Sequence, residues 1–155
     1  LLRACAALPE QLRPHLAIVG DGPARSELQA LAASIYPEAE IPGARHGADL
    51  EPYFLKADLF VLPGSGGLAV QQAMSYALPV MVAEGDGTQS DLLRPENGWD
   101  LPHADLDALT AALAAVLPDP ARLRKMGLAS YRIVAKEVNL ENMVSVFVQA
   151  VNAVI

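Results

Sequence analysis

The chain has 155 residues, of which 52% are hydrophobic and 19% are charged, and its mean hydropathy is +0.26. This length and composition suit one packed domain and exclude a disordered chain. The formal net charge of −7 disfavours nucleic acid as a partner. No apolar run approaches the roughly 20 residues of a membrane span, and the first residues lack the pattern of a signal peptide.

Cysteine and histidine are sparse. Cys5 is the only cysteine, so no internal disulfide can form, and a reducing, cytoplasmic setting fits. The three histidines, His15, His46 and His103, are scattered, and we therefore expect no metal site. Because the chain begins without Met inside an apparent helix, we expect it to be a fragment of a longer protein.

Helices and strands alternate along the first half. Residues 1–13 predict a helix, 16–19 a buried strand, and Gly22 with Pro23 the cap and first turn of the helix that follows. Residues 39–43 predict a short strand, and Pro42 indicates that this strand lies at an edge or ends there. A short helix over 49–57 and a buried strand over 58–64 complete this half.

The second half continues the alternation and then becomes helical. We expect a helix over 67–77, a buried strand over 79–87, and a helical turn with a loop over 91–99, where Asn97-Gly98 marks a turn. Leu106, Leu109, Leu113 and Val116 share one stripe of a helix. Asp119 and Asn139 are the expected caps of the last two helices. The wide apolar face of the final helix predicts packing on this domain or contact with a further one, the former being favoured.

Continuous apolar strands alternating with helices predict an α/β domain with a Rossmann-like parallel sheet and helices on both faces. In such sheets ligands bind beyond the carboxyl ends of the strands. This rule selects four loops, residues 20–23, 41–46, 63–68 and 84–90, of which three are rich in glycine.

The glycine turn over 64–68 leads into a helix. Backbone N–H groups free of side chains, together with the positive end of the helix dipole, would suit a phosphate. The alternative is that glycine here only permits a tight turn. The segment is neither a Walker loop nor a dinucleotide fingerprint, because neither spacing is present. The turn over 20–23 has the same two interpretations, and Asp21 could cap or hydrogen-bond locally. In the turn over 84–90 the polar residues could face the cleft or only solvent, and this candidate is the weaker one.

Three stretches carry a family resemblance: "LAIVGDGPARSELQALA", "ADLFVLPGSGGLAVQQAMSYALPVMVAEGDGTQSDLLRPENGW" and "DLDALTAALAAVLPDPARLRKMG". Nearly the whole chain resembles the C-terminal, donor-binding half of group 1 (GT4-like) glycosyltransferases of the GT-B fold. The resemblance implies transfer of a sugar from a nucleotide-sugar to an acceptor hydroxyl, with retention and without a metal or other cofactor. It implies that the acceptor is held by a missing N-terminal domain, and that the enzyme is cytoplasmic or peripheral at the inner face of a membrane.

The resemblance also implies a donor site. Residues 65–68 would face the diphosphate, residues 41–43 the base, and residues 20–23 and 85–88 the sides of the cleft. No catalytic residue is assigned within this chain. The expected donor-binding residues are Gly20, Asp21, Gly22, Pro42, Gly43, Ser65, Gly66, Gly67, Leu68, Gln72, Asp86, Gly87 and Thr88.

The sequence departs from the family in three places. Gly64 and Gln72 stand where many relatives carry two glutamates. Ala77 replaces a glycine at a helix end, which would cost roughly 1 kcal/mol if the residue is left-handed. The family's first, central strand, with its phosphate-binding Arg and Lys, would precede Leu1. Arg25, Arg45 and Lys56 are the basic residues nearest the expected cleft, and each is interpreted as a surface charge.

The departures leave alternatives open. The first expectation is a donor-binding domain that is inactive on its own and acts in glycan or polysaccharide assembly. The second is a non-catalytic nucleotide-sugar-binding or protein-interaction module, which the missing carboxylates favour. A third, a sugar-nucleotide epimerase of the same fold, lacks the acidic and histidine residues that would support it.

Overall fold

The described strands form two parallel sheets. The computed structural model describes residues 1–64, 67–83, 87 and 91–153. In one sheet β1 (Ala17–Val19) pairs with β2 (Glu40–Gly43), and in the other β4 (Val80–Ala83) lies between β3 (Phe60–Leu62) and β5 (Gly98–Leu101). Each of these pairings is parallel, as expected of strands that alternate with helices.

Helices account for most of the remaining described chain. They are α1 (Leu2–Ala7), α2 (Arg25–Ile35), α3 (Glu51–Lys56), α4 (Leu68–Ser75), α5 (Leu106–Val116), α6 (Pro120–Lys136) and α7 (Leu140–Asn152), with 3-10 turns at Glu10–Leu12 and Gly47–Asp49. The helix expected over 1–13 is interrupted, because Pro9 follows the extended residue Leu8. The next helix begins at Arg25 with Ala24 as its N-cap residue, so the expected cap at Gly22 and first turn at Pro23 are wrong.

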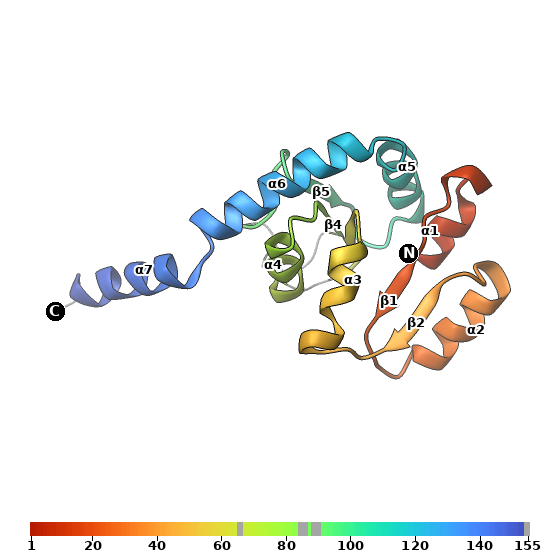
Figure 1. Ribbon diagram of the computed structural model, residues 1–155, viewed down its shortest axis with the longest axis horizontal. Coiled ribbons are helices and arrows are strands. Elements are labelled where there is room, and N and C mark those ends of the chain that lie inside the picture. The colour runs from red at the N-terminus through yellow and green to blue at the C-terminus, as the bar shows by residue number, and fades with distance from the viewer. Residues whose placement is uncertain (65–66, 84–86, 88–90, 154–155) are drawn as a thin grey trace.

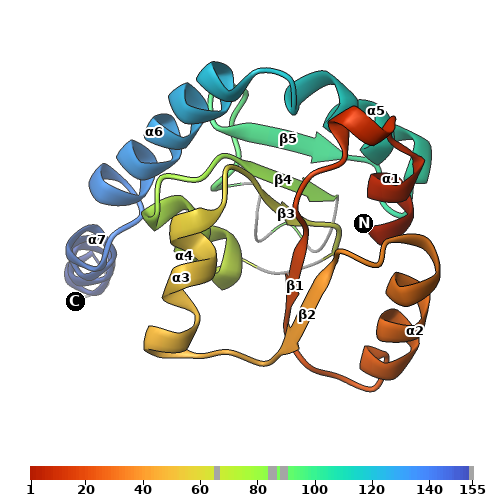
Figure 2. The ribbon, with the colours of Figure 1, turned by 45° about the vertical axis from the view of Figure 1, so that its right-hand side comes forward.

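Helices cover both faces of the strands, which confirms the expected architecture. Along β4, Val80 and Val82 join a core cluster with residues of α3 and α4, whereas Met81 joins a cluster with residues of α1 and α5. This alternation follows from the two-residue period of a strand. In Figure 2 the helices α1, α2 and α5 lie to the right of the strands, and α3, α4 and α6 lie to the left.

The expectation that β1 and β3 are buried is wrong in part. Every residue of β4 is buried, but β3 is half-buried throughout and Ala17 of β1 is exposed. The reason is pairing, since β4 has neighbours on both sides and β1 and β3 each pair on one side among the described strands. In the doubly wound order 3-2-1-4-5-6, β2 and β1 take places 3 and 2, and β3, β4 and β5 take places 4, 5 and 6. No described strand takes the central place 1.

Strand β5 lies where the sequence predicted a turn and a loop. Asn97 ends the turn and Gly98 begins the strand, which pairs with β4 from Val80–Gly98 to Ala83–Leu101. A Cβ atom on Gly98 would lie 2.2 Å from the carbonyl oxygen of Val80. The glycine therefore permits close approach of two strands and is not part of the turn itself.

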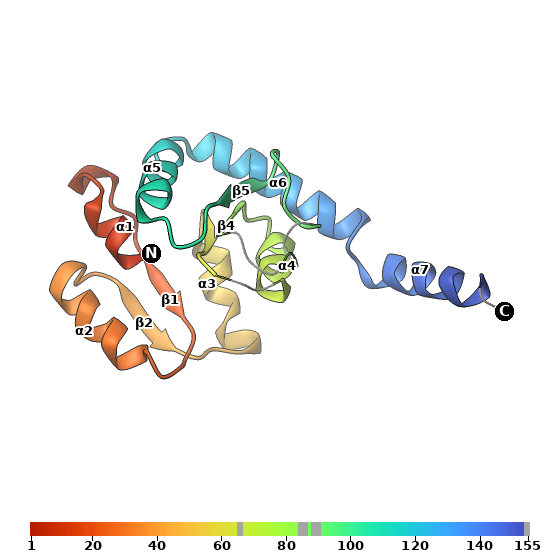
Figure 3. The ribbon, with the colours of Figure 1, turned by 180° about the vertical axis from the view of Figure 1, so that it is seen from behind.

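Helix α7 extends away from the rest of the molecule (Figures 1 and 3). None of its residues is buried, and Met143, Phe147 and Val151 are 63%, 69% and 40% exposed. The favoured expectation that this helix packs on the domain is therefore wrong. Asn139 does cap it, as predicted, by accepting a hydrogen bond from the backbone N–H of Asn142. Among the described residues no helix is long and apolar enough to cross a membrane.

Candidate functional site

The carboxyl ends of β1 and β2 meet at Gly20 and Gly43. The N–H of Gly20 donates to the carbonyl oxygen of Gly43 at 3.1 Å, which joins the two loops directly after the strands. Both glycines have positive φ, +153° and +85°, a conformation that side chains rarely adopt. The carboxylate of Asp21 accepts from the N–H of Gly22 at 2.8 Å and so fixes the turn locally, as expected.

Several predicted glycines border open space. A Cβ atom on Gly20, Gly22 or Gly64 would meet no heavy atom within 4 Å. Steric contact within the fold therefore does not explain glycine at Gly22 or Gly64, neither of which has positive φ. Space beside such backbone leaves room for a ligand to approach the chain closely.

Helix α4 begins at the second predicted glycine turn. Gly67 is its N-cap residue, no side chain caps it, and its first turn carries no acidic residue. Within helix α4 itself, no acidic side chain therefore neutralises the positive end of the helix dipole. Leu68 is 83% exposed, and Gln72, one turn further on, is exposed as well. The neighbouring Gln71 is structural, because its Nε2 donates to the carbonyl oxygen of Val138 at 2.9 Å.

The predicted residues fall into two described groups. Gly20, Asp21, Gly22, Pro42 and Gly43 gather at the ends of β1 and β2, whereas Gly67, Leu68 and Gln72 lie on the first turns of α4. Gly87 is exposed, with a φ of +87°. The other predictions, Ser65, Gly66, Asp86 and Thr88, lie outside the described residues.

Arg25 is the residue that the sequence analysis undervalued. Its Nη1 lies 3.2 Å from Oδ2 of Asp21, and its side chain is only 37% exposed. Its guanidinium lies so close to Gly43 that a Cβ atom there would stand 2.8 Å from Cζ. The spacing of Asp21 and Arg25, four residues apart, was the available signal. By contrast Arg45 and Lys56 are exposed, as expected.

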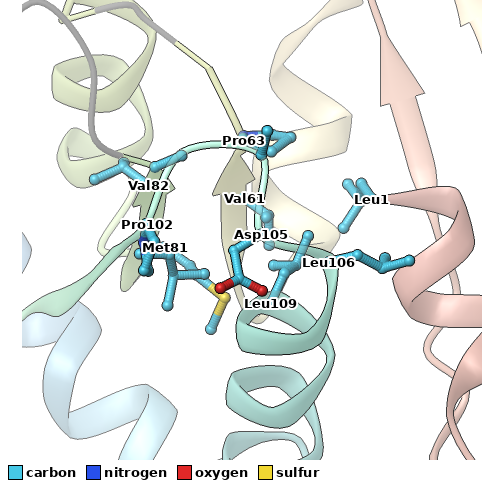
Figure 4. A pocket seen from close by; sticks show the side chains of 12 residues that line it. Leu1, Val61, Pro63, Met81, Val82, Pro102, Asp105, Leu106 and Leu109 are labelled. Atoms are coloured by element: carbon cyan, nitrogen blue, oxygen red, sulfur yellow. The ribbon is translucent and has the colours of Figure 1, made fainter.

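A pocket of about 270 Å³ lies elsewhere, between the ends of β3 to β5 and the start of α5 (Figure 4). Its lining is apolar apart from Asp105, whose carboxylate lies among Met81, Leu106 and Leu109. That carboxylate already accepts from the N–H of Ala108 at 2.8 Å as the N-cap of α5. Among the residues that the structure describes, none of those predicted to bind the donor lines the pocket.

A metal site needs several ligating side chains close together. The described residues contain no group of three or more His, Cys, Asp or Glu side chains that could hold a metal ion. Cys5 is buried, and this burial raises the pKa of its thiol, so the group stays protonated and unreactive near neutral pH.

The fold, with its glycine turns at the carboxyl ends of parallel strands, is that of a doubly wound α/β domain. Residues 1–119 match the family model described as glycosyl transferases group 1. This match covers well over half of the chain, and the chain therefore belongs to the group 1 glycosyltransferases.

Two curated relatives show how the chain compares in sequence. It is 30% identical over 139 residues to the GDP-mannose-dependent alpha-(1-6)-phosphatidylinositol monomannoside mannosyltransferase of Mycolicibacterium smegmatis, covering 79% of this chain and 36% of the relative. It is 30% identical over 151 residues to the corresponding monoacylated-substrate mannosyltransferase of Corynebacterium glutamicum, covering 88% of this chain and 39% of the relative. The chain thus spans less than half the length of these relatives.

Solved structures confirm the fold. Sucrose-phosphate synthase from Thermosynechococcus elongatus superposes with a TM-score of 0.81 at 25% identity, covering 98% of this chain and 41% of that one. Anabaena Alr3699/HepE in complex with UDP superposes with a TM-score of 0.80 at 17% identity, covering 99% and 44%. These partial coverages fit one half of a two-domain GT-B enzyme, and the relatives support a glycosyltransferase rather than the interaction module.

Proposed function

We propose that this chain is the nucleotide-sugar-binding domain of a glycosyltransferase that transfers a sugar to an acceptor hydroxyl in glycan or polysaccharide biosynthesis. The observation that carries the proposal is the family match over residues 1–119 on a fold whose open glycine turns lie at the ends of parallel strands. The rest of the enzyme, absent from a chain that spans under half of its relatives, would hold the acceptor.

The described groups have complementary parts in this proposal. The uncapped N-terminus of α4, with no acid in its first turn, would receive the diphosphate. Gln72, exposed one turn into the helix, would donate to or accept from a sugar hydroxyl. The turn at Gly20–Gly22 would border the nucleoside, because it leaves space beside the backbone at the end of β1, and Gly43, covered by Arg25, would lie next to it.

The reaction would depend mainly on stabilising the departing nucleoside diphosphate. Proposed with it, from the family resemblance, are retention of configuration and independence of a metal. Gly64 and Gln72 carry no carboxylate, and Arg45 and Lys56 are exposed. We therefore expect the isolated chain to bind donor without catalysing transfer. We place the enzyme in the cytoplasm or peripherally at the membrane, through other parts of the polypeptide.

Nucleotide binding to the 155-residue chain tests the proposal. GDP, UDP and ADP would be titrated calorimetrically into the chain and into two variants, Gly22→Val and Gln72→Ala. Neither substitution disturbs a contact of the fold, because Gly22 faces open space and the Gln72 side chain is exposed. Each should weaken binding at least several-fold, whereas Gln29→Ala on the exposed side of α2 should not.

Two outcomes would contradict the proposal. If a folded chain bound none of the three nucleotides at millimolar concentration, the non-catalytic interaction module would be the better explanation. If one nucleotide bound but both variants bound it as tightly as the parent chain, the site would lie elsewhere. GDP and UDP are the first probes, because relatives are described as GDP-mannose-dependent and structural neighbours were solved with UDP.

A further inference from the structure

The guanidinium of Arg25 lies face-on against the backbone of Gly43. A Cβ atom on Gly43 would stand 2.8 Å from Cζ, 2.8 Å from Nη2 and 3.0 Å from Nη1 of Arg25. Three nearly equal distances mean that the planar group covers the position where a side chain would begin. Because Gly43, at the end of β2, has no side chain, the guanidinium of Arg25 can lie there. Any larger residue at this position would displace the guanidinium.

Asp21 fixes the same guanidinium from the loop after β1. Its Oδ2 lies 3.2 Å from Nη1 of Arg25, and its Oδ1 accepts from the N–H of Gly22 at 2.8 Å. Arg25 is thus held between the ends of two strands, and it is not a freely solvated side chain. The interaction joins α2, the loop after β1 and the end of β2 at the point where doubly wound folds bind ligands.

The remaining donors of Arg25 have no partner within the described part of the chain. Nε is buried and makes no hydrogen bond. Nη2 makes none to a described residue either, and the side chain as a whole is 37% exposed. An unpaired buried donor costs about 1–3 kcal/mol. Nε is too deeply buried for a ligand to reach, whereas Nη2 is accessible and is the donor that can bind a ligand acceptor.

The chemistry of the pair selects the part of a nucleotide that it would bind. Asp21 neutralises Arg25 at 3.2 Å, so the pair attracts a phosphate weakly. A guanidinium stacks well on flat heterocycles, and here one of its faces is already occupied by Gly43. Nη2 offers a donor and the half-exposed Asp21 an acceptor, which together match a base edge that presents C=O beside N–H.

We propose that the Asp21–Arg25 pair, seated on Gly43, recognises the nucleobase of the donor and contributes to the choice of base. The proposal rests on the proposed nucleotide-sugar function and deepens it. Guanine and uracil both present a C=O beside an N–H, so the pair suits either base.

The test compares nucleotide with pyrophosphate. GDP, UDP and inorganic pyrophosphate would be titrated into the 155-residue chain, into Arg25→Gln and into Arg25→Lys. Arg124→Gln, which removes an exposed arginine of α6, serves as the matched control. Loss of a stacked, hydrogen-bonded base should weaken the preferred nucleotide roughly 5- to 100-fold in both Arg25 variants. Pyrophosphate affinity should stay unchanged, because that ligand has no base.

The outcomes separate this proposal from the previous one. If the parent chain binds no nucleotide, both proposals fail. If it does bind, nucleotide affinity unchanged in folded Arg25→Gln overturns only the role of Arg25. Equal losses for nucleotide and pyrophosphate, or full rescue by Arg25→Lys, would mean that Arg25 acts as a positive charge for phosphate. Thermal unfolding of each variant checks that it is folded. If Arg25→Gln is unfolded, the nucleotide affinity of Arg25→Lys tests the proposal instead.

Discussion

Gly127 of α6 lies directly against the backbone of Ala77, so closely that a Cβ atom on Gly127 would stand 1.9 Å from the Ala77 carbonyl oxygen. Ala77 follows the end of α4 and has a φ of +57°. Its N–H donates to the carbonyl oxygen of Met74, and the N–H of Leu78 donates to the carbonyl oxygen of Ala73. These two hydrogen bonds form a Schellman motif. The end of α4 and the middle of α6 therefore fix one another.

Gly127→Ala should strongly destabilise the chain. The added methyl group would overlap a backbone carbonyl, which cannot turn aside as a side chain could, so α4 and α6 must separate. Overpacking of this kind costs about 3 kcal/mol. Urea unfolding measures the loss, and Leu128→Ala, at a neighbouring residue that is 54% exposed, should cost far less. A loss under 1 kcal/mol for Gly127→Ala would mean that the two helices pack less tightly than described.

Ala77→Gly should stabilise the chain by about 1 kcal/mol. The left-handed conformation at Ala77 strains an alanine, and glycine adopts it without that strain. The control is Ala111→Gly, at an exposed position inside α5, where the same substitution should destabilise by about 1 kcal/mol. Opposite signs in thermal or urea unfolding would support the assignment, and a loss at both positions would contradict it.

The sequence alone predicted features that local chemistry decides. Asp119 and Asn139 cap their helices as predicted, because caps depend on a few adjacent residues. The parallel arrangement followed from apolar strands such as β4. Of the candidate site, the turn at Asp21 and the exposed position of Gln72 were predictable in the same way.

Features that depend on distant neighbours were not predictable. An apolar face like that of α7 indicates burial but not the surface that buries it, and here no part of the described chain does. Strand β5 includes the polar residue Asp100 and begins at the glycine of an Asn-Gly pair, so nothing local distinguished it from a loop. Arg25 owes its position to Gly43, which lies 18 residues further along the chain and meets it only in the fold.

Asn97→Ala should destabilise the chain by about 2–3 kcal/mol. Asn97 is fully buried, its Oδ1 accepts from the N–H of Arg94 at 2.7 Å, and its Nδ2 donates to the carbonyl of Leu92 at 3.1 Å. Alanine would leave both backbone groups without these partners. The exposed neighbour supplies the control, Glu96→Ala, with an expected change below about 0.5 kcal/mol. Equal stabilities of the two variants would show that water replaces the amide.

Glu137→Gln should lower Tm by roughly 2 °C at neutral pH and not at all in acid. Arg94 donates to both carboxylate oxygens of Glu137, at 3.0 and 2.7 Å, and this hydrogen bonding lowers the pKa of Glu137 below its ordinary value. A lowered carboxyl pKa contributes stability above the ordinary pKa, and the contribution is lost as the pH falls through the lowered one. The difference in Tm should therefore begin to shrink below about pH 4, near the ordinary pKa of a carboxyl group, and should vanish once the pH lies below the lowered pKa.

The matched control for Glu137→Gln is Glu141→Gln, which removes the same charge from an exposed position on α7 without breaking an ion pair described in the structure. It should leave Tm nearly unchanged at both pH values. A Tm difference for Glu137→Gln that persisted in acid would show that the amide disturbs packing at the end of α6, and that the ion pair with Arg94 is not its source.

Removal of residues 140–155 should leave the free energy of unfolding within about 0.5 kcal/mol of the complete chain. Helix α7 buries none of its described residues, and the shortened chain keeps Val138, whose carbonyl accepts from Gln71. Leu113→Ala, which empties a position only 2% exposed in α5, should by comparison cost about 3 kcal/mol. Urea unfolding of the three chains measures both effects. A loss above about 2 kcal/mol on truncation would mean that the apolar face of α7 packs on the domain in solution, as its pattern first indicated.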